Sequence, residues 1–141
     1  MRVMALDIGA VRTGIAVSDA AGRVASPVKV LPTAEVRQAA TSFRQLLAEY
    51  EPELLLAGLP ISLDGVENQQ AAQVREIAKE ISTTTNLPLS FQDERLSSSE
   101  ARRMLQEAGC TEKQMRGKID MIAASIFLQT YLDAASVVDD S

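Results

Sequence analysis

The chain contains no histidine, and this absence excludes several kinds of chemistry. Neither a Ser-His-Asp nor a Cys-His catalytic arrangement can form, and a zinc site with histidine ligands is equally excluded. The single cysteine, Cys110, cannot form an internal disulfide, which fits a reducing compartment, and we expect a cytoplasmic protein. Any bound metal ion must be held by oxygen atoms, which favours Mg²⁺ or Mn²⁺.

Large aromatic side chains and long apolar runs are also scarce. Tryptophan is absent and aromatic residues make up 4% of the chain, so the core must be aliphatic. No apolar run approaches the roughly 20 residues of a membrane span, and no signal-peptide pattern opens the sequence. With 141 residues, the chain has the size of one domain. We expect that domain to cover residues 1–136, followed by a disordered tail over 137–141.

Positive charge is limited, which bears on nucleic acid as a partner. The net charge is -5, whereas proteins that bind polyanions normally present a basic surface. The distribution is uneven, because six basic residues gather in the second half of the chain and leave a local basic face available. These are Arg95, Arg102, Arg103, Lys113, Arg116 and Lys118.

The order of apolar segments predicts an α/β fold with a mixed five-stranded sheet and helices on both of its faces. Strands are expected at 3–7, 13–18, 25–31, 54–60 and 87–91, and helices at 33–50, 71–81, 97–109 and 118–132. Thr33 is a plausible N-cap of the first helix, and Ser97 with Glu100 has the spacing of a capping box. Tight early turns favour antiparallel pairing, while the later strand-helix-strand units require parallel pairing.

Carboxylates lie at the edges of several apolar elements. Asp7 ends the first strand, Asp93 and Glu94 follow the last strand, and Asp120 lies in the first turn of the last helix. Ligands of open sheets collect beyond the carboxyl ends of parallel strands. Three carboxylates there could hold two oxygen-ligated metal ions about 4 Å apart and cut a phosphodiester by in-line attack of water.

Simpler interpretations exist for each acidic position. Asp120 could be an acid favoured by the helix dipole, and residues 93–95 could form a surface ion-pair cluster. A structural Asp7 would still need a cationic partner such as Arg12 or Arg95.

Four ordered blocks resemble the YqgF (RuvX) family of Holliday junction resolvase-like nucleases. They are Asp7-Ile8-Gly9 with residues 12–19, Gly58-Leu59-Pro60 with Asp64-Gly65, Asp93-Glu94-Arg95-Leu96 with Ser99 and Ala101, and Lys118-Ile119-Asp120 with Ala123-Ala124, Leu128-Gln129 and Tyr131-Leu132. The blocks cover nearly the whole chain at compatible spacing. The resemblance implies an RNase H-like fold, a divalent-metal nuclease site with Mg²⁺ or Mn²⁺, and a role in 5′-end maturation of precursor 16S ribosomal RNA.

Carried over by position, the catalytic and metal-binding acids are Asp7, Glu94 and Asp120. Secondary candidates are Gly9, Asp64 and Asp93, of which Asp93 should point to the opposite face of its strand from Glu94. The candidates for substrate binding are Arg12, Arg95, Arg116 and Lys118, and arginine in particular can donate two parallel hydrogen bonds to a phosphate.

Other functions stay open at this point. The substrate could be a four-way DNA junction, or the chain could be a non-catalytic nucleic-acid module, because the segment before Asp120 is less basic than is usual in the family. An actin-like or sugar-kinase ATPase shares the Asp-x-Gly turn but needs two lobes. The expected partners are structured RNA and ribosomal precursor particles, not a membrane, and the sequence leaves a homodimer open.

Overall fold

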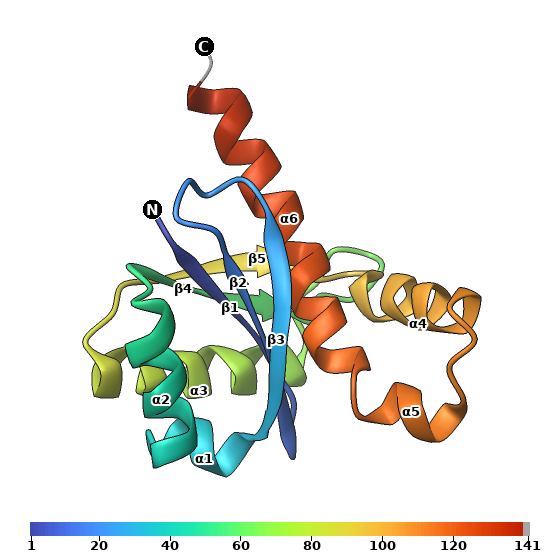
Figure 1. Ribbon diagram of the computed structural model, residues 1–141, viewed down its shortest axis with the longest axis horizontal. Coiled ribbons are helices and arrows are strands. Elements are labelled where there is room, and N and C mark those ends of the chain that lie inside the picture. The colour runs from blue at the N-terminus through green and yellow to red at the C-terminus, as the bar shows by residue number, and fades with distance from the viewer. Residues whose placement is uncertain (140–141) are drawn as a thin grey trace.

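A five-stranded sheet forms the centre of the protein, as the computed structural model shows for residues 1–139 (Figure 1). Its strands follow the order β3-β2-β1-β4-β5. The bounds are Val3–Ile8 for β1, Arg12–Ser18 for β2, Ala25–Pro32 for β3, Leu54–Leu59 for β4 and Leu89–Asp93 for β5. β1 pairs antiparallel with β2 and parallel with β4, which confirms the predicted mixed sheet.

Helices cover both faces of this sheet and create two apolar cores. On one face α1 (Thr33–Arg37), α2 (Thr41–Tyr50) and α3 (Gln69–Thr85) enclose a core that includes Phe43 and Ile81. On the other face α6 (Ile119–Asp139) crosses β1, β2 and β3 (Figure 1). There Phe127 and Leu128 pack against alternate residues of the strands. The sheet is therefore buried on both sides, as its continuous apolar strands require.

The segment predicted as one helix over 33–50 is two helices, α1 and α2. Ala39 lies between them with φ of 50°, a left-handed conformation that ends α1. Thr33 is not the N-cap, because the helix begins at Thr33 and Pro32 precedes it without a side-chain cap. The Thr33 hydroxyl instead bonds to Gly9 and Thr13. That prediction was wrong because tertiary partners outcompeted local capping.

The predicted capping box at Ser97 is also absent. Leu96 occupies the N-cap position of α4 (Ser97–Glu107), with φ of 69° and no side-chain cap bond. Glu100 instead pairs with Arg103. A short helix that sequence patterning did not predict, α5 (Glu112–Arg116), follows, and a genuine capping box of Thr111 and Gln114 opens it.

The last helix runs beyond its predicted end. α6 continues to Asp139 and so includes residues 137–139 of the expected tail, while residues 140 and 141 lie outside the described part of the chain. Within residues 1–139, none of the helices combines the length and the apolar character that crossing a membrane would need.

Candidate active site

Asp7 occupies a buried position at the carboxyl end of β1. Its residue is 9% exposed, and its neighbours along the strand are fully or almost fully buried. In the pairing with β2 it lies opposite Gly14. Alternation along β1 puts Asp7 on the same face as Val3 and Ala5, which pack against α6. The carboxylate of Asp7 is therefore directed into the interface between the sheet and α6.

Glu94 reaches this interface from the strand at the edge of the sheet. It follows β5, and its backbone N–H donates to the carbonyl of Leu59 at 3.1 Å. Its side chain lies over Gly58, where an added Cβ would come 2.5 Å from Glu94 Oε2 and 2.7 Å from the ring of Phe127. Only glycine leaves room for both the carboxylate and the aromatic ring at this point.

Asp120 comes from the first turn of α6, and a second glycine allows the close approach of that helix. A Cβ on Gly14 would overlap the backbone of Asp120 and Met121, because α6 rests directly on the backbone of β2. The carboxylate of Asp120 pairs with Arg12, with 3.4 Å between Asp120 Oδ2 and Arg12 Nε. Arg12, which was a candidate partner of Asp7, therefore binds the third acid instead.

Burial and mutual repulsion raise the pKa values of the two inner acids. Burial is the largest cause for Asp7, followed by the negative charge of Glu94 and a hydrogen bond with it, and the pKa of Asp7 is well above its ordinary value. Burial likewise raises the pKa of Glu94, with the charge of Asp120 adding to the effect. Raised pKa values are expected for two carboxylates that are close together without a cation.

The donor set suits an oxygen-liganded cation, but the three acids do not form a finished cage. Among residues 1–139, no group of three or more acidic, histidine or cysteine side chains is already arranged to hold a metal ion. Two of the acids contact each other, and Asp120 faces Arg12 at the rim. Their chemistry fits Mg²⁺ or Mn²⁺, because a divalent cation takes oxygen ligands and would offset the mutual repulsion of the carboxylates.

The remaining residues of the Asp93-Glu94-Arg95 motif form a brace beside the acids. The Asp93 carboxylate accepts from Arg95 N at 2.8 Å and from Arg95 Nε at 2.7 Å, which keeps the pKa of Asp93 low despite partial burial. Arg95 also donates to the carbonyl of Leu63 at 3.4 Å. Asp93 is thus directed away from Asp7 and Glu94, and Arg95 ties the end of β5 to the loop that follows β4. In that loop the Asp64 carboxylate accepts from Val66 N and shapes the turn.

Thr33, which was predicted to be a helix N-cap, fixes the turn between β1 and β2. Thr33 Oγ1 donates to Gly9 O at 2.7 Å, and Thr33 N donates to Val11 O at 2.8 Å. Because that hydroxyl hydrogen is used on Gly9, the 2.8 Å contact between Thr13 and Thr33 must be donated by Thr13. Gly9 N donates to Arg12 O at 2.8 Å and closes the turn that carries Arg12.

The predicted basic residues lie on the segment that leads into Asp120. Lys113 and Arg116 belong to α5, and Lys118 directly precedes α6. All three are exposed, and none forms a salt bridge within residues 1–139. By contrast, Arg102 and Arg103 of α4 pair with acids. Three positive charges that are unpaired in the described part of the chain therefore lie close in sequence to one of the acids.

Two of the residues that shape the site, Gly14 and Gly58, were not predicted to do so. Each interrupts a buried strand, which is a recognisable sign of close approach by a backbone or a ligand. The sequence does not say which group makes that approach. The structure identifies these groups as the start of α6 at Gly14 and the Glu94 carboxylate with Phe127 at Gly58.

Solved structures of Holliday junction resolvases share this fold. "T. thermophilus RuvC in complex with Holliday junction substrate" aligns with a TM-score of 0.57 and 13% identity, over 96% of each chain. The fowlpox virus resolvase bound to Holliday junction DNA aligns with a TM-score of 0.56 and 10% identity, over 96% of this chain and 99% of its own. The fold thus belongs to the RNase H-like class found in resolvase-type nucleases.

Sequence comparison then gives the family. The model of the RuvX family, described as Holliday junction resolvase, matches residues 1–134, and the chain belongs to this family. A "Putative pre-16S rRNA nuclease" of Syntrophomonas wolfei is 36% identical over 140 residues, covering 99% of each chain. A protein of the same name from Streptomyces coelicolor is 39% identical over 137 residues, or 96% of this chain and 82% of its own. The predicted family is confirmed, and the chain is an enzyme of the nuclease class.

Proposed function

We propose that this protein is a divalent-metal-dependent nuclease that matures the 5′ end of precursor 16S ribosomal RNA. The observation that supports the proposal is the contact of the buried Asp7 with Glu94, with Asp120 close enough for its charge to raise the pKa of both. The names of the related proteins support the RNA substrate. We also propose that the enzyme acts in the cytoplasm, where Cys110 stays a free thiol.

Asp7, Glu94 and Asp120 would hold Mg²⁺ or Mn²⁺, with two ions as the expected number. When bound, such ions activate a water molecule and stabilise the leaving oxygen of the phosphodiester. Asp7 and Glu94 would have to be anionic to act as ligands, and a bound cation would offset the burial and repulsion that raise their pKa values. As a metal ligand, Asp120 would leave its contact with Arg12, and the guanidinium would then be available to a phosphate oxygen.

The exposed basic residues before α6 would hold the substrate backbone. Arg116 and Lys118 lie on the chain immediately before Asp120, and Arg12 faces Asp120 across the site. Phosphates of a bound strand would therefore follow a line from α5 to the β1–β2 turn. Arg95 is less suited to this role than predicted, because Asp93 already occupies its guanidinium.

Asp7→Asn is the direct test of the metal site. The substitution keeps the shape of the side chain and removes a charged ligand, so we expect Mn²⁺-dependent cleavage to fall on the order of a thousandfold. The measurement is cleavage of a precursor 16S rRNA fragment across a series of Mg²⁺ and Mn²⁺ concentrations. Asp133→Asn, an exposed acid farther along α6, is the matched control and should cut at the wild-type rate. Unchanged cleavage by Asp7→Asn would overturn the proposal.

A four-way DNA junction is the second candidate substrate, because the family model and the aligned structures carry resolvase descriptions. The two functions are distinguished by measuring the cleavage of both substrates with the same enzyme preparation. Preferred cleavage of the RNA fragment supports maturation of ribosomal RNA. Preferred, symmetric cleavage of the junction would replace it with junction resolution while keeping the same three acids.

A further inference from the structure

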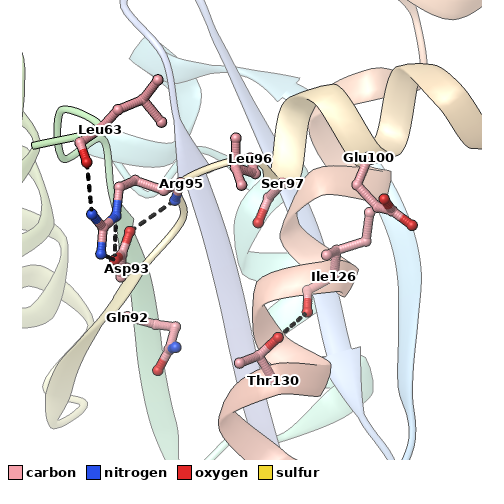
Figure 2. Close-up of a pocket in the computed structure, with 9 residues that line it drawn as sticks. All are labelled: Leu63, Gln92, Asp93, Arg95, Leu96, Ser97, Glu100, Ile126 and Thr130. Carbon is pink, nitrogen blue, oxygen red and sulfur yellow. Dashed lines mark hydrogen bonds and ion pairs between the residues drawn. The ribbon is translucent and has the colours of Figure 1, made fainter.

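A hollow of about 530 Å³ lies between the end of β5, the start of α4 and the middle of α6, and Asp93 and Arg95, which flank Glu94 in the chain, line it (Figure 2). Its volume falls within the roughly 300–1,000 Å³ of ordinary ligand sites. Ile126, on α6, lines the hollow next to Phe127, which packs at the Glu94 carboxylate. The hollow therefore adjoins the position of Glu94, although none of the three acids lines it.

Its walls include apolar side chains that are left exposed. Leu63 is 78% exposed and Leu96 is 65% exposed, while Ile126 is partly buried. Leu96 also has a left-handed backbone, with φ of 69°, which is unfavourable for a bulky residue. Such strain is concentrated at ligand-binding positions, where surrounding structure maintains it. An exposed leucine held in this conformation, beside an active site, indicates a surface made for contact with an apolar face.

The charges around the hollow disfavour a phosphate inside it. Asp93 and Glu100 both line it, whereas its one basic residue, Arg95, is already paired with Asp93. Glu100 pairs with Arg103, which is not part of the lining. An anion entering the hollow would approach two carboxylates and no free cation. The ligand that fits is uncharged, with flat apolar faces and polar edges.

Gln92 supplies a free polar group for such an edge. Within residues 1–139 its side chain forms no hydrogen bond, and Figure 2 shows its amide below the Asp93–Arg95 pair and not bonded to it. A glutamine amide offers one donor and one acceptor side by side, an arrangement that matches N6 and N7 of adenine. The nearby carboxylates add only acceptors, which favours a base with an amino group over uracil.

We propose that this hollow binds the base of a nucleotide next to the cleaved phosphate, with adenine preferred over uracil. The base lies between Leu96 and Ile126, and its edge pairs with Gln92. Because a paired base cannot enter such a hollow, the strand must be single-stranded or locally opened there. The inference rests on the proposed nuclease function and adds the base that the enzyme prefers.

Equilibrium binding of short single strands tests this proposal without any cleavage. Asp7→Asn protein is titrated with oligoadenylate and with oligouridylate, and we expect affinity for the adenine strand to be on the order of tenfold higher. Adding Gln92→Leu should abolish most of this difference. Adding Gln73→Leu, an exposed glutamine on α3 across the sheet, should leave it intact. The two glutamine variants are matched in chemistry and differ in their place in the fold.

Each result decides the proposal. Equal affinity for both strands, no measurable binding of either strand, or a preference that survives Gln92→Leu would overturn it. Thermal melts of the variants show whether a loss of binding is due to a loss of folding. Leu96→Ala is a second substitution in the wall of the hollow and should lower the affinity for both oligonucleotides. Failure of the nuclease function is seen separately, as absence of cleavage by the wild-type enzyme, and leaves the measured base preference unaffected.

Discussion

At the scale of single residues, the site depends on side chains that are missing as much as on those present. Gly14 lets the backbone of Asp120 rest on β2, and Gly58 leaves space for the Glu94 carboxylate beside Phe127. The three acids are thus brought together by backbone contact and not by long, adaptable side chains. Their relative positions should therefore be sensitive to a single added methyl group.

Gly14→Ala tests this sensitivity. The new methyl group must push the start of α6 away from β2, so we expect a loss of about 1–3 kcal/mol in unfolding free energy. Denaturant unfolding measures that loss, and Mn²⁺-dependent cleavage should fall with it because Asp120 is displaced. Gly117→Ala is the control, since its nearest neighbour would lie 3.9 Å from the new Cβ. Similar stability of the two variants would show that α6 can shift without cost.

Asp7 also gives the metal-free protein a predictable pH dependence. Its pKa is raised in the folded state, mainly by burial, so the folded protein binds more protons than the unfolded chain at mildly acidic pH. Stability should therefore fall as pH rises through the raised pKa values of Asp7 and Glu94. In metal-free buffer, Asp7→Asn should melt higher than wild type at about pH 8, by about 4 °C for each kcal/mol of relieved repulsion.

The same comparison at about pH 5 should show a smaller difference, because wild-type Asp7 is then protonated more fully. Addition of Mn²⁺ at about pH 8 should raise the melting temperature of the wild type and leave Asp7→Asn nearly unchanged. A wild-type melting temperature that increases with pH in metal-free buffer would contradict the assigned direction of the pKa shift.

At the scale of elements, the β1–β2 hairpin is held in place by α1. Thr33 contacts the turn through its hydroxyl and its backbone, and the buried Thr13 hydroxyl completes the network. The first helix thus supports the turn that presents Arg12 to Asp120. This contact explains why Thr33 begins a helix without capping it.

Thr33→Val keeps the shape and removes the hydroxyl. The carbonyl of Gly9 and the hydroxyl of Thr13 then lose a partner, which should cost about 1–3 kcal/mol. Hydrogen exchange should reveal faster exchange at the Gly9 amide, whose bond to Arg12 O closes the turn. Thr83→Val, at an exposed position of α3, should change neither quantity. If both variants behave alike, the hairpin does not depend on this clamp.

For the candidate site, the sequence could predict that the three acids lie at one edge of the sheet. Asp7, Glu94 and Asp120 each interrupt or adjoin an apolar segment, and a sheet gathers such residues at one edge. The alternation that separated Asp93 from Glu94 was equally local. By contrast, the break at Ala39 and the left-handed Leu96 depend on partners distant in sequence. The N-caps predicted at Thr33 and Ser97 do not form: each residue is the first of its helix, and the residue before it makes no side-chain cap bond.

At the scale of the whole molecule, an acidic protein must bind a polyanion with few cations. The net charge is -5, and much of the basic charge is neutralised by neighbouring acids. The exposed Lys113, Arg116 and Lys118 are the positive charges nearest in sequence to Asp120. Binding should therefore rely on a few phosphate contacts close to the site.

Replacing Lys113, Arg116 and Lys118 together by alanine should reduce the salt dependence of binding. For single-stranded RNA, the slope of log affinity against log salt should become about 2 units less steep. Fluorescence anisotropy over a series of KCl concentrations measures the slope. Replacing three exposed lysine or arginine residues elsewhere, namely Lys29, Arg44 and Lys79, is the control and should leave the slope unchanged. An equal reduction in both variants would indicate diffuse attraction instead of a local path.

The seat of α6 on Gly14 has a consequence for synthesis of the protein on the ribosome. Asp7 and Glu94 precede α6, which brings Asp120, along the chain, so both are translated before it. A nascent chain that stops before residue 119 can present Asp7 and Glu94 but lacks the third acid and the helix that covers them. If the three acids carry the proposed cleavage, cutting activity is withheld until α6 has been translated and has packed against Gly14.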